Sequence, residues 1–215
     1  MIDLHTHSVF SDGELIPAEL IRRASVLGYT AIAITDHVDF TNIEHTISSL
    51  KEVTSIKDEY DMDIFVGVEL THVPPAKLQK LVGKARKLGA EIIVVHGETT
   101  VEPVAQGTNH AALLLDIDIL AHPGMITIED AMLAKDSGIC LEITCRCGHN
   151  RTNGHVARIA KETGTGLIVN TDAHAPWDLV NDETAFKVAM GAGLDETEAK
   201  KATGSQPLNL LKSIK

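Results

Sequence analysis

Residues 92–96 read Ile-Ile-Val-Val-His, four branched apolar residues followed by a histidine. A short β-branched run that stops at Gly97 is typical of a buried strand. The same pattern, a few apolar residues and then a side chain able to bind a metal, occurs at six other points of the chain. Those runs end at His5 and His7, at His37, at Glu69, at His122, at Cys145, and at Asp172 and His174.

Helix-like segments separate these runs. We expect strands over residues 2–7, 31–35, 64–69, 92–96, 117–122, 140–144 and 167–171. We expect helices over 17–27, 43–60, 75–88, 109–115, 128–137 and 153–163, with two more in the tail at 183–192 and 196–202. The boundaries carry helix signals, such as Pro17 near a start and Gly28 just past an end.

The strand–helix alternation predicts an α/β fold with seven βα units, each of about 31 residues, a typical size for such a unit. We therefore expect a single domain over residues 1–215 that forms a distorted, TIM-barrel-like (β/α)7 barrel. A doubly wound open sheet is the alternative. Its ligands would gather at one switch point, whereas here they follow nearly every strand.

Composition narrows the functional class. A hydrophobic content of 44% in 215 residues suits a globular domain, and no apolar run is long enough to cross a membrane. A formal net charge of -11 disfavours broad binding to nucleic acid. A cleavable signal would remove His5 and His7, and the three cysteines do not form a disulfide framework, so we expect a cytoplasmic location.

The first and last strands carry the strongest metal-ligand signals. His5 and His7 are two residues apart on one strand, so both imidazoles enter the same face, and Asp12 can reach back over it. Asp172 and His174 repeat this spacing after the last strand. In a parallel barrel all strand ends meet on one face, where active sites are built.

Four intermediate strands each add one candidate ligand. His37, Glu69, His96 and His122 close their apolar runs. A buried, unpaired Glu69 would be costly unless metal ions neutralised it, and its carboxylate has enough lone pairs to bridge two ions. Asp36 is expected to orient a neighbouring imidazole.

Nine residues therefore form the predicted metal site: His5, His7, Asp12, His37, Glu69, His96, His122, Asp172 and His174. Nine ligands imply two or three divalent ions, and mixed imidazole and carboxylate suits zinc, manganese or iron. No metal is assigned to the other five histidines, which are His45, His72, His110, His149 and His155.

The segment after residues 140–144 has a different character. Its strand offers no strong ligand, and Cys145 at its end is interpreted as a packed thiol. Arg146 and Arg151 follow, and an arginine fork matches phosphate oxygens. We predict that Arg146 or Arg151 binds the phosphate of a substrate, with a solvent-exposed loop arginine as the alternative.

Taken together, these motifs resemble the PHP (polymerase and histidinol phosphatase) family over nearly the whole chain. The resemblance rests on His5-x-His7, Ser11-Asp12-Gly13, Thr35-Asp36-His37, Gly67-Val68-Glu69, His96, Ala121-His122-Pro123-Gly124 and Asp172-x-His174. It implies a distorted seven-stranded barrel with three metal ions. The first ion would be held by His5, His7, Glu69 and Asp172, the second by Glu69, His96 and His122, and the third by Asp12, His37 and His174.

The resemblance implies a small stand-alone phosphoesterase of the histidinol-phosphatase-like kind. We expect hydrolysis of a small phosphomonoester, histidinol phosphate-like or nucleotide-like, by a metal-activated hydroxide at a trinuclear site. Glu69 would bridge ions, and Asp12 or His174 would protonate the leaving group.

Three alternatives remain. A phosphodiesterase or 3'-5' exonuclease is disfavoured by the negative charge and by an aromatic content of 3%. A non-catalytic metal-binding scaffold is disfavoured because the ligand set is complete. An amidohydrolase-type enzyme would use a lysine carbamate on the fourth strand, where this chain has His96.

Overall fold

The strands of the protein form one parallel sheet. The computed structural model describes residues 1–214, except for the side chain of residue 54. The strands in this range are β1 (Ile2–Asp3), β2 (Ala31–Ile34), β3 (His37–Val38), β4 (Asp63–Leu70), β5 (Ile92–His96), β6 (Ile119–Ala121), β7 (Cys140–Thr144) and β8 (Leu167–Asn170). They pair in the order β1-β2-β4-β5-β6-β7-β8, and β3 pairs with the end of β4.

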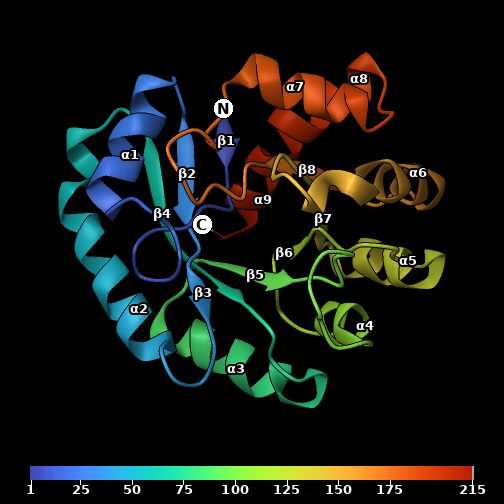
Figure 1. Ribbon diagram of the computed structural model, residues 1–215, viewed down its shortest axis with the longest axis horizontal. Helices are drawn as coiled ribbons and strands as arrows, with labels where there is room; N and C mark the ends of the chain where they lie inside the picture. Colours follow the sequence, from blue (N-terminus) through green and yellow to red (C-terminus); the bar gives the residue numbers. More distant parts are fainter. Residues whose placement is uncertain (215) are drawn as a thin grey trace.

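The two edges of this sheet meet. A parallel bridge joins Thr6 to Ala173, and the His7 amide donates to the Ala173 carbonyl at 2.9 Å. The Asp172 amide donates to the His5 carbonyl, also at 2.9 Å. The sheet is therefore a nearly closed seven-stranded barrel, which confirms the distorted (β/α)7 fold predicted from the alternation of strands and helices (Figure 1).

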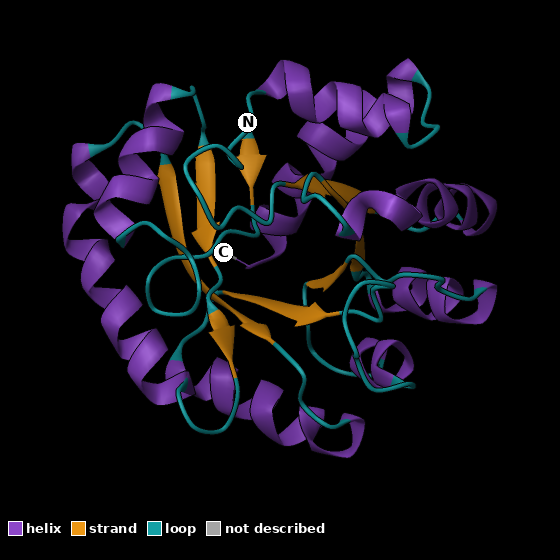
Figure 2. Ribbon diagram, in the orientation of Figure 1, coloured by secondary structure: helices purple, strands orange, loops and turns teal. Residues whose placement is uncertain are grey.

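Helices surround the barrel, as Figure 2 shows. They are α1 (Pro17–Val26), α2 (Ile43–Lys51), α3 (Pro75–Leu88), α4 (Thr108–Leu113), α5 (Ile128–Ser137), α6 (Asn153–Thr163), α7 (Asp182–Gly191), α8 (Glu196–Lys200) and α9 (Gln206–Ile214), with 3-10 turns η1 (Glu52–Glu59) and η2 (His149–Thr152) and a π turn η3 (Lys201–Ser205). Helix α5 shows how local sequence sets a boundary. The Thr127 hydroxyl caps its start by accepting from the Asp130 amide, and Gly138 ends it with a φ of 73°.

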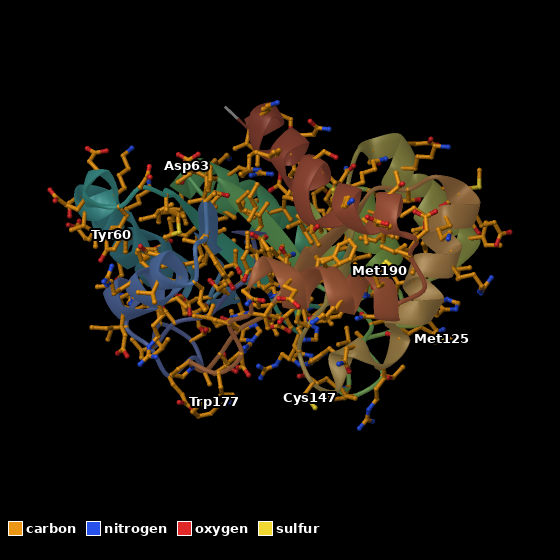
Figure 3. All side chains as sticks on the ribbon, turned by 90° about the horizontal axis from the view of Figure 1, so that it is seen from above. Tyr60, Asp63, Met125, Cys147, Trp177 and Met190 are labelled. Carbon is orange, nitrogen blue, oxygen red and sulfur yellow. The ribbon has the colours of Figure 1, made fainter. Side chains whose placement is uncertain are left out.

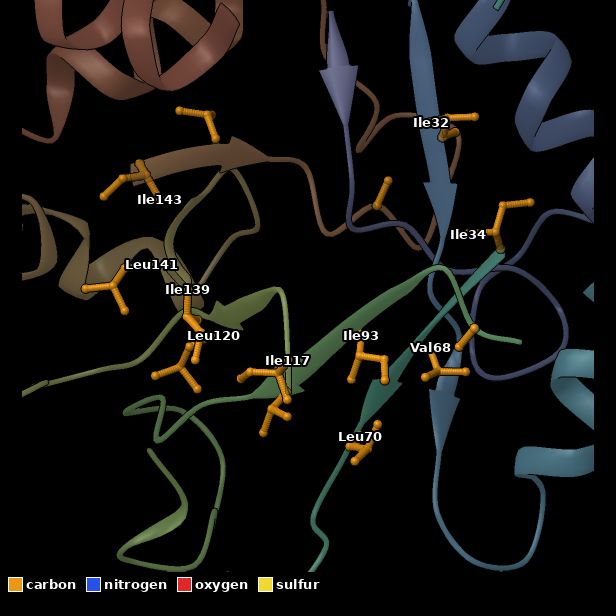
Figure 4. Close-up of a cluster of buried hydrophobic side chains, with 14 of the residues drawn as sticks. Ile32, Ile34, Val68, Leu70, Ile93, Ile117, Leu120, Ile139, Leu141 and Ile143 are labelled. Carbon is orange, nitrogen blue, oxygen red and sulfur yellow. The ribbon is translucent and has the colours of Figure 1, made fainter. Parts of the chain in front are cut away.

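Strand residues alternate between two cores. Ile32, Ile34 and Ile93 belong to the outer core between sheet and helices, part of which Figure 4 shows. Their neighbours Ala33 and Ile92 belong to a smaller core inside the barrel. Because the side chains of a strand alternate between its faces, a polar residue two positions beyond an inward residue also points into the barrel.

Helix α9 covers one end of the barrel. Its Leu210 and Leu211 join the inner core with Ile2, Phe65 and Ile168. These partners lie at or near the beginnings of their strands, so the helix seals the N-terminal end of the barrel. In Figure 3 this helix lies on the opposite side of the molecule from the labelled Cys147 and Trp177.

The structure differs from several of the predicted elements. The strand predicted over residues 2–7 ends at Asp3 in the structure, and beyond it Thr6 makes only an isolated bridge to Ala173. Residues 52–59 form a 3-10 turn instead of continuing the predicted helix 43–60, and β3 was not predicted. The tail contains the additional helix α9, and residues 201–205 form a π turn where the sequence predicted the end of helix 196–202. No helix in the described part of the chain is long and apolar enough to cross a membrane.

Candidate metal centre

The nine predicted ligands converge at the C-terminal end of the barrel. They extend from strand ends or from the loops that follow them, so a single pocket collects side chains from residue 5 to residue 174. Six are buried, namely His5, His7, Glu69, His96, His122 and Asp172, whereas Asp12, His37 and His174 lie nearer the mouth.

The alternation of side chains along β4 directs the Glu69 carboxylate into the barrel. In β4, Glu69 is two residues beyond Gly67 and four beyond the inward Phe65, so its carboxylate enters the barrel. Glu69 Oε1 lies 3.4 Å from His5 Nε2 and 3.7 Å from His122 Nε2. Its Oε2 lies 3.7 Å from His7 Nε2 and 2.7 Å from His37 Nδ1. The carboxylate thus faces two different sets of imidazoles with its two oxygens.

Asp172 lies opposite Glu69. Asp172 Oδ1 is 3.3 Å from His7 Nε2 and 3.8 Å from His5 Nε2, and Oδ2 is 3.5 Å from His122 Nε2. Both His122 and Asp172 have positive φ, at 28° and 54°. This uncommon backbone conformation turns each side chain toward the pocket after its strand has ended.

The outer group is built around Asp12. Its Oδ1 lies 3.2 Å from His174 Nε2 and 3.5 Å from His37 Nε2, and these two nitrogens are themselves 3.5 Å apart. His7 belongs to the same set, because its ligand atom lies within 4.8 Å of those of Asp12, His37 and His174. Its ring also stacks on that of His174, with centroids 4.0 Å apart. Partial burial opposes ionisation, but His174 and His37 lower the pKa of Asp12 to about 2.

The second implied grouping differs from the one observed. Resemblance placed His96 with Glu69 and His122, but the structure groups His96 with His122 and His149, and groups Glu69 with His5 and His122. His96 Nε2 instead lies 3.2 Å from Glu102 in the following loop. No metal was predicted for His149, but a nitrogen of its ring lies within 4.8 Å of nitrogens of His96 and His122.

Several buried polar atoms lack a hydrogen-bond partner within the described residues. Among the predicted ligands they are His5 Nε2, both ring nitrogens of His7, His122 Nδ1 and Glu69 Oε1, and the others are Thr46 Oγ1, Glu142 Oε1 and Asn170 Nδ2. Leaving such atoms unpaired costs roughly 1–3 kcal/mol each. A divalent cation would pair with one nitrogen of each of these imidazoles and with Glu69 Oε1, so the residues present fit a metal centre.

Electrostatics also suits cation binding. Burial and the neighbouring imidazoles lower the pKa of His7 and of His122 well below the ordinary value, which keeps both in the neutral form that binds metals. Burial alone would raise the pKa of Glu69, but His5 and His37 outweigh it and hold that pKa well below its usual range.

Other side chains position the ligands. Glu142 Oε2 lies 2.8 Å from His5 Nδ1, and Thr71 Oγ1 lies 2.6 Å from His37 Nδ1. The prediction that Asp36 orients an imidazole is wrong. Its carboxylate instead accepts hydrogen bonds from Ser8 and Ser11, and so holds the loop that carries Asp12.

Glu142 was not among the site residues predicted from the sequence. A signal was present, because a glutamate in the middle of the apolar strand β7 must point either into the outer core or into the barrel. Cys145 packs against the outer core, as interpreted from the sequence.

The two predicted phosphate-binding arginines have different surroundings. Arg146 lies at the pocket, where its Nη1 donates to the Asp172 carbonyl at 3.3 Å and lies 3.5 Å from Asp178 Oδ2. A cleft of about 390 Å³ opens beside it, lined also by Asp12, His174 and Trp177. Arg151 is exposed on η2, and within the described residues no ion pair connects it to the pocket.

Comparison with known proteins identifies the family. The sequence model described as the PHP domain matches residues 3–162, so the chain belongs to the PHP domain family. An uncharacterized protein of Methanocaldococcus jannaschii is 55% identical, with 99% of both chains covered. Ribonuclease P protein component 3 of Methanosarcina mazei is 28% identical (98% of this chain, 88% of the relative), and a probable phosphatase of Thermoanaerobacter sp. is 27% identical (91% and 88%).

Solved structures share the fold. A chain in an archaeal ribonuclease P structure with mature tRNA superposes with a TM-score of 0.75 at 18% identity, covering 98% of this chain and 90% of that one. Histidinol phosphate phosphatase of Lactococcus lactis, determined with zinc, L-histidinol and phosphate, gives 0.62 at 16% identity, covering 90% and 94%.

Proposed function

We propose that the protein is a metal-dependent phosphoesterase that hydrolyses a small phosphomonoester. The observation that carries this proposal is the convergence of nine ligand-type side chains, with buried partnerless nitrogen and oxygen atoms among them, at the catalytic end of a parallel barrel. Membership of the PHP domain family and similarity to a probable phosphatase support it.

The nine residues would hold two or three ions of zinc, manganese or iron. The ligands are those predicted from the sequence: His5, His7, Asp12, His37, Glu69, His96, His122, Asp172 and His174. Bound divalent ions would supply a water of lowered pKa and would neutralise charge on phosphoryl oxygens.

Side chains of the protein would bridge the ions, donate a proton to the leaving group and orient the phosphate. Glu69 faces different imidazoles with its two oxygens, which suits a bridging carboxylate. Asp12 and His174 lie at the exposed edge beside the cleft. Of the two predicted proton donors, His174 fits the role, whereas the pKa of Asp12, lowered to about 2, keeps its carboxylate ionised, so Asp12 would instead accept a hydrogen bond there. Arg146 lines the same cleft and is the better placed of the two arginines to orient a phosphate, whereas the role predicted for Arg151 gains no support from its contacts.

The cleft favours a small substrate. A volume of about 390 Å³ is in the range of small-molecule sites. The net charge of -11 disfavours a nucleic-acid strand as the main ligand, since such strands are bound through clustered cations.

A second candidate is a non-catalytic partner module. It is favoured by the 28% identity, over 98% of this chain, to a protein named Ribonuclease P protein component 3. In that case the protein would assemble with an RNA-containing complex, and the metal centre would stabilise the fold.

One experiment separates the two candidates. Protein loaded with manganese, iron or zinc is screened against phosphomonoesters, including histidinol phosphate and nucleotides, and against short oligonucleotides. We expect metal-dependent monoester turnover that Glu69→Ala abolishes together with part of the bound metal. Turnover of diesters alone would indicate a nuclease, and stoichiometric metal without turnover would favour the partner module.

A further inference from the structure

Three side chains outside the predicted ligand set gather beside His96. Glu102, from the loop after β5, lies between three imidazoles. Its Oε2 is 3.2 Å from His96 Nε2 and 3.3 Å from His72 Nε2, and its Oε1 is 3.4 Å from His149 Nε2. The loop is fixed at its start, because any side chain at Gly97 would collide with the Ala121 carbonyl.

His149 has the features of a metal ligand. Its side chain is 7% exposed, and the Thr99 hydroxyl lies 2.9 Å from its Nδ1, which leaves Nε2 to face the pocket. Fixing one ring nitrogen by a hydrogen bond is the usual way in which a ligating histidine is oriented. A nitrogen of His149 lies within 4.8 Å of nitrogens of both His96 and His122.

The spacing around Glu102 is that of shared ligands. Charge-assisted N–H···O bonds are about 2.7–2.9 Å long, and the surface pair His110 Nδ1–Asp130 Oδ1 has such a length, 2.7 Å. Two ligands bound at ~2.0–2.2 Å to one tetrahedral zinc lie roughly 3.3–3.6 Å apart. The contacts of Glu102 with His96 and His149, at 3.2 and 3.4 Å, lie closer to that separation.

Two of the predicted ligand pairs have a similar spacing. His174 and Asp12 approach to 3.2 Å, and His7 and Asp172 to 3.3 Å. The contacts of Glu102 with His96 and His149 thus fall within the range of separations found among the predicted ligands, 2.7 to 3.8 Å.

Backbone geometry supplies an independent observation. Within the described residues, positive φ in a residue other than glycine occurs at His72, His122 and Asp172. Two of these are predicted ligands, and the third, His72 with a φ of 53°, presents its Nε2 to Glu102. Uncommon backbone conformations of this kind concentrate at functional sites.

We propose that His149 and Glu102 are two further metal ligands, acting on the ion that His96 and His122 hold. The proposal rests on the metal centre of the proposed function but not on the reaction. His72 would position the Glu102 carboxylate from its outer side. The centre would then extend beyond the nine predicted positions onto the loops after β5 and β7.

Metal binding tests the proposal directly. Metal-free full-length protein is titrated with zinc against a chromophoric chelator, and with cobalt while its visible absorption is recorded. His149→Ala and Glu102→Gln should each bind one equivalent over about 100-fold more weakly than the unmodified protein, a larger loss than the roughly 10- to 100-fold that follows removal of a partner hydrogen-bonded to a ligand. The cobalt absorption of that equivalent should also shift. Two exposed residues provide matched controls, His110 of the surface pair for the histidine variant and Glu129 of helix α5 for the glutamate variant. His110→Ala and Glu129→Gln should leave the zinc isotherm and the cobalt absorption unchanged.

Each result has a defined meaning. If both variants gave the isotherm and the cobalt spectrum of the unmodified protein, the proposal would be overturned. If only one variant differed from the unmodified protein, the proposal would fail for the residue whose variant did not. Glu102 is on an exposed loop, so Glu102→Gln stays informative even if His149→Ala misfolds. Lack of phosphoesterase activity with altered isotherms would refute the proposed function alone.

Discussion

At the residue scale, burial and charge divide the imidazoles into two kinds. Burial lowers the pKa of His7 and of His122, and no neighbouring carboxylate outweighs it. For His5 the carboxylates of Glu142 and Glu69 outweigh burial and raise its pKa well above the ordinary value. His5 is therefore a ligand whose proton a metal ion must displace, and Glu142 is the neighbouring carboxylate that contributes most to its raised pKa.

Glu142→Gln tests this contribution. The substitution keeps the size and a hydrogen-bond acceptor for His5 but removes the charge that makes the imidazole more basic. We expect zinc affinity to fall roughly 10- to 100-fold, with the fold retained. Chelator competition measures the change, and Glu162→Gln on the exposed face of α6 is the control. An unchanged affinity would show that Glu142 has only a packing role.

At the element scale, the strand ends explain what the sequence could predict. Ligands such as His96 follow apolar runs directly, and parallel strands bring their ends together, so barrel and pocket could be foreseen without coordinates. The contacts of His149 and Glu102 could not, because they depend on the paths of two loops, which no periodic pattern encodes. Helix α9 was missed because its role is to cover a barrel end that exists only after folding.

Helix α9 offers a matched pair of substitutions. Leu211 is 5% exposed and packs in the inner core, whereas Leu208 on the same helix is 46% exposed. We expect Leu211→Ala to lower the free energy of unfolding by about 2–4 kcal/mol, and Leu208→Ala by less than about 0.5 kcal/mol. Denaturant unfolding measures both. Equal effects would mean that the helix does not seal the barrel. Metal content should stay the same, because the centre lies at the other end.

At the scale of the whole molecule, metal binding and folding are linked. The pocket joins loops that lie as far apart in sequence as Asp12 and His174, so ions bound there would connect both ends of the chain. Binding to the folded state alone stabilises a protein by about 2.7 kcal/mol at a free ligand concentration of 100 Kd. Removal of metal should therefore lower the thermal midpoint of the entire barrel rather than loosen one loop.

The size of this effect should depend on pH. Burial lowers the pKa of His37, but Glu69 outweighs it and raises that pKa to about 8, above the ordinary 6.5. In the metal-free protein this raised pKa contributes stability that is present below pH 6.5 and is lost as the pH rises through about 8. Metal ions require the deprotonated ring, so the gain on adding manganese should grow over the same interval and then level off. Thermal unfolding with manganese or with chelator, below pH 6.5 and above pH 8, measures both trends. An equal manganese-dependent shift at the two pH values would mean that ion binding releases no proton from His5 or His37.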